Sequence, residues 1–152
     1  YRIADIDIQS LNWRQAALIF KEVVKIKPDE EKGYASLIDL NFRLGEGKQA
    51  IKELDNYIKY LKINNRSSDA IQFLEKQVEE RPQQAAICRR LGELYFMAGN
   101  LEKAVQQLDM TREILMKSGD RAGAIGAVQR IIELNPPDIE QYRKTLQSLQ
   151  LS

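Results

Sequence analysis

The chain of 152 residues contains no histidine and a single cysteine, Cys88. Histidine is the commonest general base and the commonest metal ligand in proteins, so its absence weighs against both kinds of site. One cysteine cannot form a disulfide within the chain, and without a histidine it lacks the partner that would activate it. We therefore expect no enzymatic activity, no cofactor and no bound metal. We expect Cys88 to be a buried, unreactive thiol.

Neither sign of charge predominates, because 23 Lys and Arg stand against 22 Asp and Glu. A nucleic-acid-binding protein usually shows a marked basic excess, since phosphate contacts dominate its affinity. No apolar run approaches the roughly 18 residues that cross a bilayer, and no charged-then-apolar leader opens the chain. We expect a cytoplasmic protein with no nucleic-acid partner and no membrane insertion. Since the first residue is Tyr1 rather than methionine, we also expect a fragment of a longer protein or a processed form.

Prolines are few, and three of the four recur at a fixed interval. Pro28, Pro82 and Pro136 stand 54 residues apart. The same step relates many other pairs of identical residues: Leu37 and Leu91, Leu40 and Leu94, Gly45 and Gly99, Leu54 and Leu108, Leu61 and Leu115. A fixed period of this size is the signature of a repeat protein.

Apolar residues recur at spacings of three and four nearly everywhere, the pattern of amphipathic helices. Pro28 ends the first such segment, and Asp29 is a candidate N-cap for the next. Short turns make neighbouring helices antiparallel, and no credible strand is present. We expect a single all-α domain over residues 1–152, with about eight helices near 13–26, 30–44, 48–63, 69–80, 83–98, 101–117, 121–134 and 138–150.

Under the 54-residue step, residues 1–9 take the place of 55–63 and 109–117. Ile3 and Ile6 are then expected in the tail of a helix, and the chain is expected to begin inside an array of repeats rather than at a capping unit. A repeat buries its apolar face only against its neighbours, so an end without a cap exposes apolar surface.

The clearest motif lies in residues 85–116, where the residues follow the L-G-x2-Y…G…A-x3-[FL] pattern: Leu91-Gly92, Tyr95, Gly99, Ala104 and Leu108. The preceding unit repeats it in part, with Ile38 and Asn41 in place of the usual small residue and tyrosine. The chain thus resembles the tetratricopeptide repeat family. Its signature alanines at 16, 50, 70, 104 and 124 are separated alternately by 34 and 20 residues, whereas the family's period is 34. The resemblance implies an antiparallel helical-hairpin solenoid with a right-handed superhelix.

Members of that family typically bind a peptide or protein segment on a concave face lined by the first helix of each hairpin. The resemblance therefore implies a non-catalytic interaction scaffold with a protein or peptide partner. Positions carried over by the motif give these candidate partner-binding residues: Lys32, Asp39, Arg43, Arg89, Arg90, Glu93, Arg143 and Lys144. The guanidinium groups of Arg89 and Arg90 suit a carboxylate, although a solvated pair is the simpler interpretation.

Two alternative functions stay open. Exposed apolar ends of the solenoid predict self-association with a second copy. A less favoured alternative is RNA binding, as in other helical-hairpin repeats, against which the balanced charge and the irregular spacing both weigh. Gly123 and Gly126 each lower helix stability by roughly 1 kcal/mol relative to alanine, so we expect them at close helix contacts. We expect Phe42 and Phe96 in the core.

Overall fold

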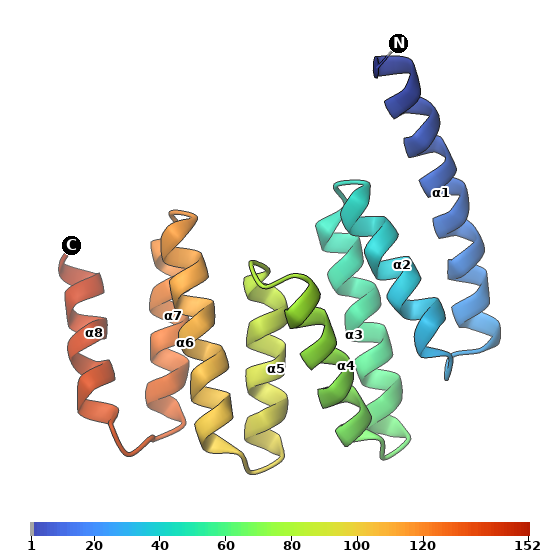
Figure 1. The fold of residues 1–152 in the computed structure, drawn as a ribbon. Helices are drawn as coiled ribbons and strands as arrows, with labels where there is room; N and C mark the ends of the chain where they lie inside the picture. Colours follow the sequence, from blue (N-terminus) through green and yellow to red (C-terminus); the bar gives the residue numbers. More distant parts are fainter. Residues whose placement is uncertain (1) are drawn as a thin grey trace. The chain divides into compact units, whose positions relative to one another are not determined.

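A computed structural model describes the backbone of residues 2–152 and the side chains of residues 9–152. Within these limits the chain is all-α, as predicted, with eight helices and no strand (Figure 1). The helices are α1 (Arg2–Ile26), α2 (Glu31–Arg43), α3 (Gly47–Ile63), α4 (Ser67–Glu80), α5 (Ala85–Met97), α6 (Leu101–Lys117), α7 (Arg121–Glu133) and α8 (Ile139–Leu151). The main difference from the prediction is α1, which begins at Arg2 instead of near residue 13. The side chains of Ile3 and Ile6 lie outside the described residues.

The helix boundaries repeat with the 54-residue step. Glu31–Arg43, Ala85–Met97 and Ile139–Leu151 begin and end at equivalent positions, and so do Gly47–Ile63 and Leu101–Lys117. One period therefore contains three helices, as the interval between the prolines indicated.

Two kinds of turn enforce this period. Gly45 and Gly99 follow α2 and α5 with φ of 73° and 83°, and Asn65 and Gly119 follow α3 and α6 with φ of 58° and 83°. This left-handed conformation is accessible to glycine and, at smaller cost than for most residues, to asparagine. Because both positions in each pair are 54 residues apart, the chain reverses direction at the same place in each period.

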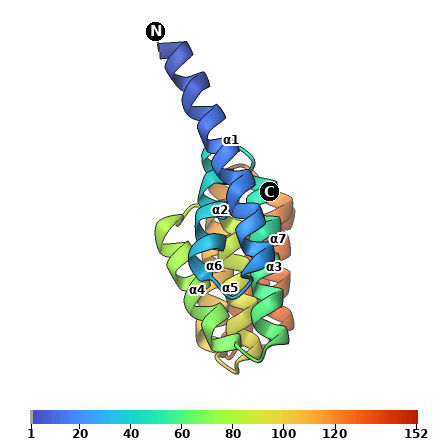
Figure 2. The ribbon, with the colours of Figure 1, turned by 90° about the vertical axis from the view of Figure 1, so that its right-hand side faces the viewer.

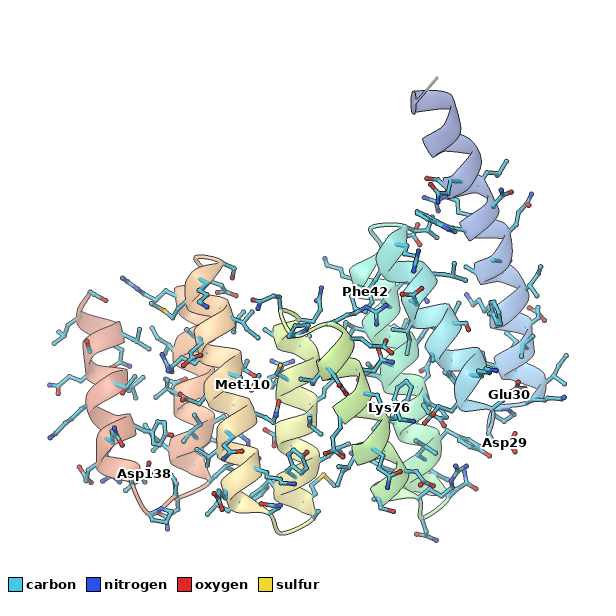
Figure 3. All side chains as sticks on the ribbon, viewed as in Figure 1. Asp29, Glu30, Phe42, Lys76, Met110 and Asp138 are labelled. Atoms are coloured by element: carbon cyan, nitrogen blue, oxygen red, sulfur yellow. The ribbon has the colours of Figure 1, made fainter. Side chains whose placement is uncertain are left out.

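The turn between α1 and α2 departs from the sequence prediction in one detail. Asp29 was the expected N-cap of α2, but that position is held by Glu30, whose side chain makes no capping hydrogen bond. Both residues lie in the turn after α1 (Figure 3). Proline at position 28 places the turn, and the helix begins one residue later than the capping rule suggested.

The chain divides into two compact units, residues 1–67 and residues 68–152. In the first unit, α2 packs against both α1 and α3. Its core contains Ile38 and Leu54, both fully buried, and the rings of Tyr34 and Tyr57, which stack with centroids 4.6 Å apart.

In the second unit, α6 packs against both α5 and α7, and α7 also packs against α8. Gly92 lets α5 approach α6 closely, because a Cβ there would lie 3.2 Å from the Ala104 carbonyl oxygen. Leu91 and Leu108 fill the space beside it and are almost fully buried. The alanine and the glycine of the predicted motif thus mark the closest approach of two helices.

Candidate functional site

A groove of about 610 Å³ lies in the second unit, between α5, α6 and α7. We call it the α5–α7 groove. Its floor is apolar and includes Leu108 and Leu115 of α6 and Ala127 of α7. Its rim carries charged side chains from α5 and α7: Arg89, Glu93, Arg130 and Glu133. A hollow of this size falls within the range of protein ligand sites.

The two glycines of α7 line this groove and behave differently. A Cβ on Gly123 would lie 3.0 Å from Cδ1 of Leu115, so this glycine does permit close contact with α6. A Cβ on Gly126 would meet nothing within 4 Å. The expectation of close helix contact is therefore wrong for Gly126. The glycine there leaves space in the groove, which a side chain would occupy.

Arg130 links the two sides of the rim. Its Nε and Nη2 donate to the Glu93 carboxylate at 2.8 and 2.7 Å, and its Nη1 donates to Glu133 at 3.0 Å. These carboxylates raise the pKa of Arg130 above its usual value, so the guanidinium stays charged. The same guanidinium lies 5.6 Å from the ring centre of Phe96, within reach of a cation–π interaction. Phe96 is 40% exposed, so its predicted place in the core is wrong.

Arg130 was missed by the sequence prediction. It lies 37 residues from Glu93 on a helix that the motif does not assign to the binding face. No local pattern distinguishes it from the other basic residues. Only the packing of α5 and α7 beside α6 brings the pair together.

The adjacent arginines Arg89 and Arg90 face different surroundings. Arg89 lines the groove one helical turn before Glu93. Arg90 is not part of that lining, and its Nη1 donates to the carbonyl oxygen of Ala86 at 3.0 Å. The predicted pair is thus divided between the groove and another face of α5.

The other predicted residues lie elsewhere. In the first unit, Arg43 donates to Asp39 at 2.7 Å and lies 5.9 Å from the ring centre of Trp13, while Lys32 is exposed near the start of α2. Arg143 and Lys144 are exposed on α8, where Arg143 pairs with Glu140. Of the eight candidates, Arg89 and Glu93 are the two that line the α5–α7 groove.

The first unit has a smaller hollow of about 340 Å³ among α1, α2 and α3, and Asn41 lines it. Asn41 occupies the repeat position of Tyr95, whose hydroxyl donates to Glu75 at 2.9 Å. The shorter asparagine is 4% exposed, and its Nδ2 has no hydrogen-bond partner. The replacement of tyrosine by asparagine was visible in the sequence. The hollow that accompanies it needed the structure.

Neither hollow has the chemistry of an active site. Among the described residues, no group of three or more acidic, cysteine or histidine side chains could hold a metal. Cys88 is fully buried, as predicted, and burial raises the pKa of its thiol, which keeps it protonated. No helix in the described part of the chain has the length and apolarity to span a bilayer.

Residues 63–114 match the tetratricopeptide repeat family. The chain carries a tetratricopeptide repeat. The matched residues take in α4, α5 and most of α6, and so contribute one wall and most of the floor of the α5–α7 groove. Tetratricopeptide repeats present extended surfaces to other proteins. The fold is therefore that of a protein-interaction scaffold.

Three solved structures share the likeness to tetratricopeptide proteins. The MamA protein is 18% identical, with 97% of this chain and 84% of that chain covered and a TM-score of 0.45. A thermophilic TPR protein of Thermus thermophilus is 16% identical, with 97% and 95% covered and a TM-score of 0.33. The C-terminal part of a TPR repeat-containing protein of Cytophaga hutchinsonii is 16% identical, with 98% and 70% covered and a TM-score of 0.33. No curated protein matches the chain in sequence.

Proposed function

We propose that the chain is a non-catalytic scaffold that binds a short segment of a partner protein in the α5–α7 groove. The observation that carries the proposal is the open space above Gly126. A helix interior favours alanine over glycine by roughly 1 kcal/mol, and a Cβ at this position meets no neighbour. Packing within the chain gives no reason for the glycine, whereas a ligand backbone or side chain seated there does.

The lining of the groove indicates the chemistry of the partner. An apolar side chain of the partner fits over Gly126 and Ala127 and contacts the leucines of α6. Arg130 is already held by two carboxylates, so Arg89 is the rim cation best placed to receive an acidic group. A planar guanidinium binds a carboxylate with two parallel hydrogen bonds. The partner segment is thus expected to combine a medium-sized apolar residue with an Asp, a Glu or a terminal carboxylate.

A peptide selection tests this proposal. A displayed library of random peptides is selected on the whole chain, and the enriched peptides are synthesised with a fluorophore for binding measurements by polarisation. Gly126→Leu fills the groove without a steric conflict and is expected to weaken binding at least tenfold. Arg89→Glu is expected to weaken binding of the acidic peptides by a similar factor.

Arg90→Glu is the matched control, because it makes the same charge change at the next residue but outside the groove. It should leave the affinity within about twofold, since rim charges away from a contact contribute little. A selection that enriches no sequence contradicts the proposal. Enriched peptides that bind Gly126→Leu as tightly as the parent chain contradict it as well.

A further inference from the structure

Helix α1 exposes an apolar stripe. Leu11, Leu18, Ile19 and Ile26 are 56%, 66%, 63% and 77% exposed. Among the side chains that the structure describes, nine large apolar ones are exposed, and these are four of them. At 3.6 residues per turn the four positions fall within an arc of about 100°. The opposite side of α1, with the buried Val24, packs on α2.

The repeat shows that this face of α1 is normally covered. Ile19 is equivalent, under the 54-residue step, to Phe73 of α4 and Ala127 of α7. Phe73 and Ala127 are only 1% and 5% exposed, whereas Ile19 is 63% exposed. In the second unit, α7 packs against α6, the antiparallel helix that precedes it. The face that bears Ile19 therefore has the position of one that a second antiparallel helix covers.

The residues before α1's stripe do not supply that helix. Leu11 stands at the position of Asn65 and Gly119, which adopt positive φ and reverse the chain before α4 and α7. A leucine enters that conformation only at a cost of roughly 1–2 kcal/mol, so the turn is disfavoured. The helix instead runs without a break from Arg2 to Ile26. Figure 2 shows its N-terminal turns continuing past the ends of α2 and α3.

We propose that α1 of a second copy covers this stripe in an antiparallel helix pair. The stripe is symmetric about the point between Leu18 and Ile19, because Leu11 precedes Leu18 by seven residues and Ile26 follows Ile19 by seven. A twofold axis at that point sets Leu18 against Ile19 and Leu11 against Ile26 of the second copy. Such self-complementarity is the requirement of a twofold interface.

The polar residues of the stripe obey the same symmetry. Gln15 precedes Leu18 by three residues and Glu22 follows Ile19 by three, and both are exposed. The twofold axis therefore sets the Gln15 amide, a hydrogen-bond donor, against the Glu22 carboxylate. At the edge of the stripe, Lys25 lies opposite Asn12 rather than another cation. No like charges meet directly across the axis, as a parallel arrangement of two identical stripes would require for Glu22.

The pair is expected to be weak. Four apolar side chains from each helix form an interface at the small end of specific protein contacts, which corresponds to a dissociation constant of roughly tens of micromolar. Sedimentation velocity of the whole chain, from about 5 µM to about 500 µM, spans that value. We expect the sedimentation coefficient to rise from that of a monomer to that of a dimer. A monomer throughout this range overturns the proposal.

Matched variants identify the surface. Ile19→Lys should abolish dimerisation, because it sets a charge against Leu18 of the second copy. Ile63→Lys, which changes an equally exposed isoleucine of α3, should dimerise like the parent. Circular dichroism of each variant checks that it folds, and Ile26→Lys gives an independent reading if Ile19→Lys does not fold. Unchanged dimerisation of the folded Ile19→Lys chain overturns the proposal.

Cross-linking tests the direction of the pair. In an antiparallel pair, the two copies of residue 12 lie about 20 Å apart along the helix axis, and so do the two copies of residue 25. A short bismaleimide should therefore join Asn12→Cys to Lys25→Cys in a mixture, but should join neither variant to itself. Native Cys88 is fully buried and serves as the unreacted internal thiol. Self-linking of either variant at the yield of the mixture contradicts the antiparallel arrangement.

Discussion

Arg130 of α7 holds the carboxylate of Glu93 of α5 with two nitrogens, at 2.8 and 2.7 Å. The pair spans the mouth of the α5–α7 groove and joins the two helices that form its rim. Both side chains are about one-third exposed, so solvent screens the interaction. Its contribution is therefore expected to be geometric, fixing the rim of the groove, more than energetic.

A double-mutant cycle measures that contribution. Arg130→Gln, Glu93→Gln and the double variant should give a coupling free energy of about 0.5–1 kcal/mol in urea unfolding, because the contact is bidentate but partly exposed. The Asp39–Arg43 pair is the control, since it joins residues one helical turn apart, at 2.7 Å, on the exposed side of α2. Its coupling should be about 0.3–0.5 kcal/mol. A smaller coupling for Arg130 and Glu93 than for the control contradicts this expectation.

Alanine substitutions should separate the glycines of the second unit. Gly126→Ala should raise the free energy of unfolding by roughly 0.5–1 kcal/mol, because it adds a helix-favouring residue where a Cβ meets nothing. Gly92→Ala should lower it by about 1–3 kcal/mol. Its Cβ would lie 3.2 Å from both the Ala104 carbonyl oxygen and Cγ of Leu108. Urea unfolding followed by circular dichroism reads both changes, and equal signs for the two variants would refute the assignment.

The N-caps of α7 and α8 give a second matched comparison. Asp120 accepts a hydrogen bond from the Gly123 backbone N–H at 2.8 Å, whereas Asp138 makes no side-chain capping bond. Asp120→Ala should therefore lower the free energy of unfolding by about 1 kcal/mol. Asp138→Ala should lower it by less than half as much. Thermal unfolding of the two variants under identical conditions provides the measurement.

Tyr95 should make the stability depend on pH in the alkaline range. Burial, together with its hydrogen bond to Glu75, raises the pKa of Tyr95 to about 12. An exposed tyrosine in the unfolded chain titrates near 10. The unfolded state therefore loses its proton first, so stability is full below about pH 10 and falls as pH rises from about 10 to 12.

Tyr95→Phe isolates this effect from the other titrating groups. The variant should be less stable near pH 7 by about 1 kcal/mol, because it lacks the hydroxyl that donates to Glu75. Between pH 9 and pH 11 it should lose less stability than the parent chain. A parent and a variant with parallel stability curves over that interval would exclude a perturbed Tyr95.

Much of the fold followed from local signals. Pro28 and Pro82 ended the helices before them, and the glycines at 45 and 99 reversed the chain where predicted. Cys88 was expected inside and lies inside. These features depend on backbone conformation and on the side of one helix that is apolar, and both are written in a few consecutive residues.

The candidate site followed less well. Glu93 was predicted, but Arg130, which holds it, was not, and Arg90 was grouped with Arg89 although the two arginines face different surroundings. Gly126 was assigned to a helix contact that does not exist. A contact across 37 residues, or the absence of one, depends on how three helices pack together, and no local pattern encodes that distance.

The sequence by itself determined the period, the three helices within it and the residues that turn the chain. The tertiary structure alone decided which equivalent positions are covered and which are open. Ile19, Phe73 and Ala127 share one place in the repeat, yet only Ile19 is exposed, because helix α1 continues through Leu11 where the other repeats turn back. Burial depends on which helix lies alongside, and a periodic sequence leaves that partner to the packing of the chain.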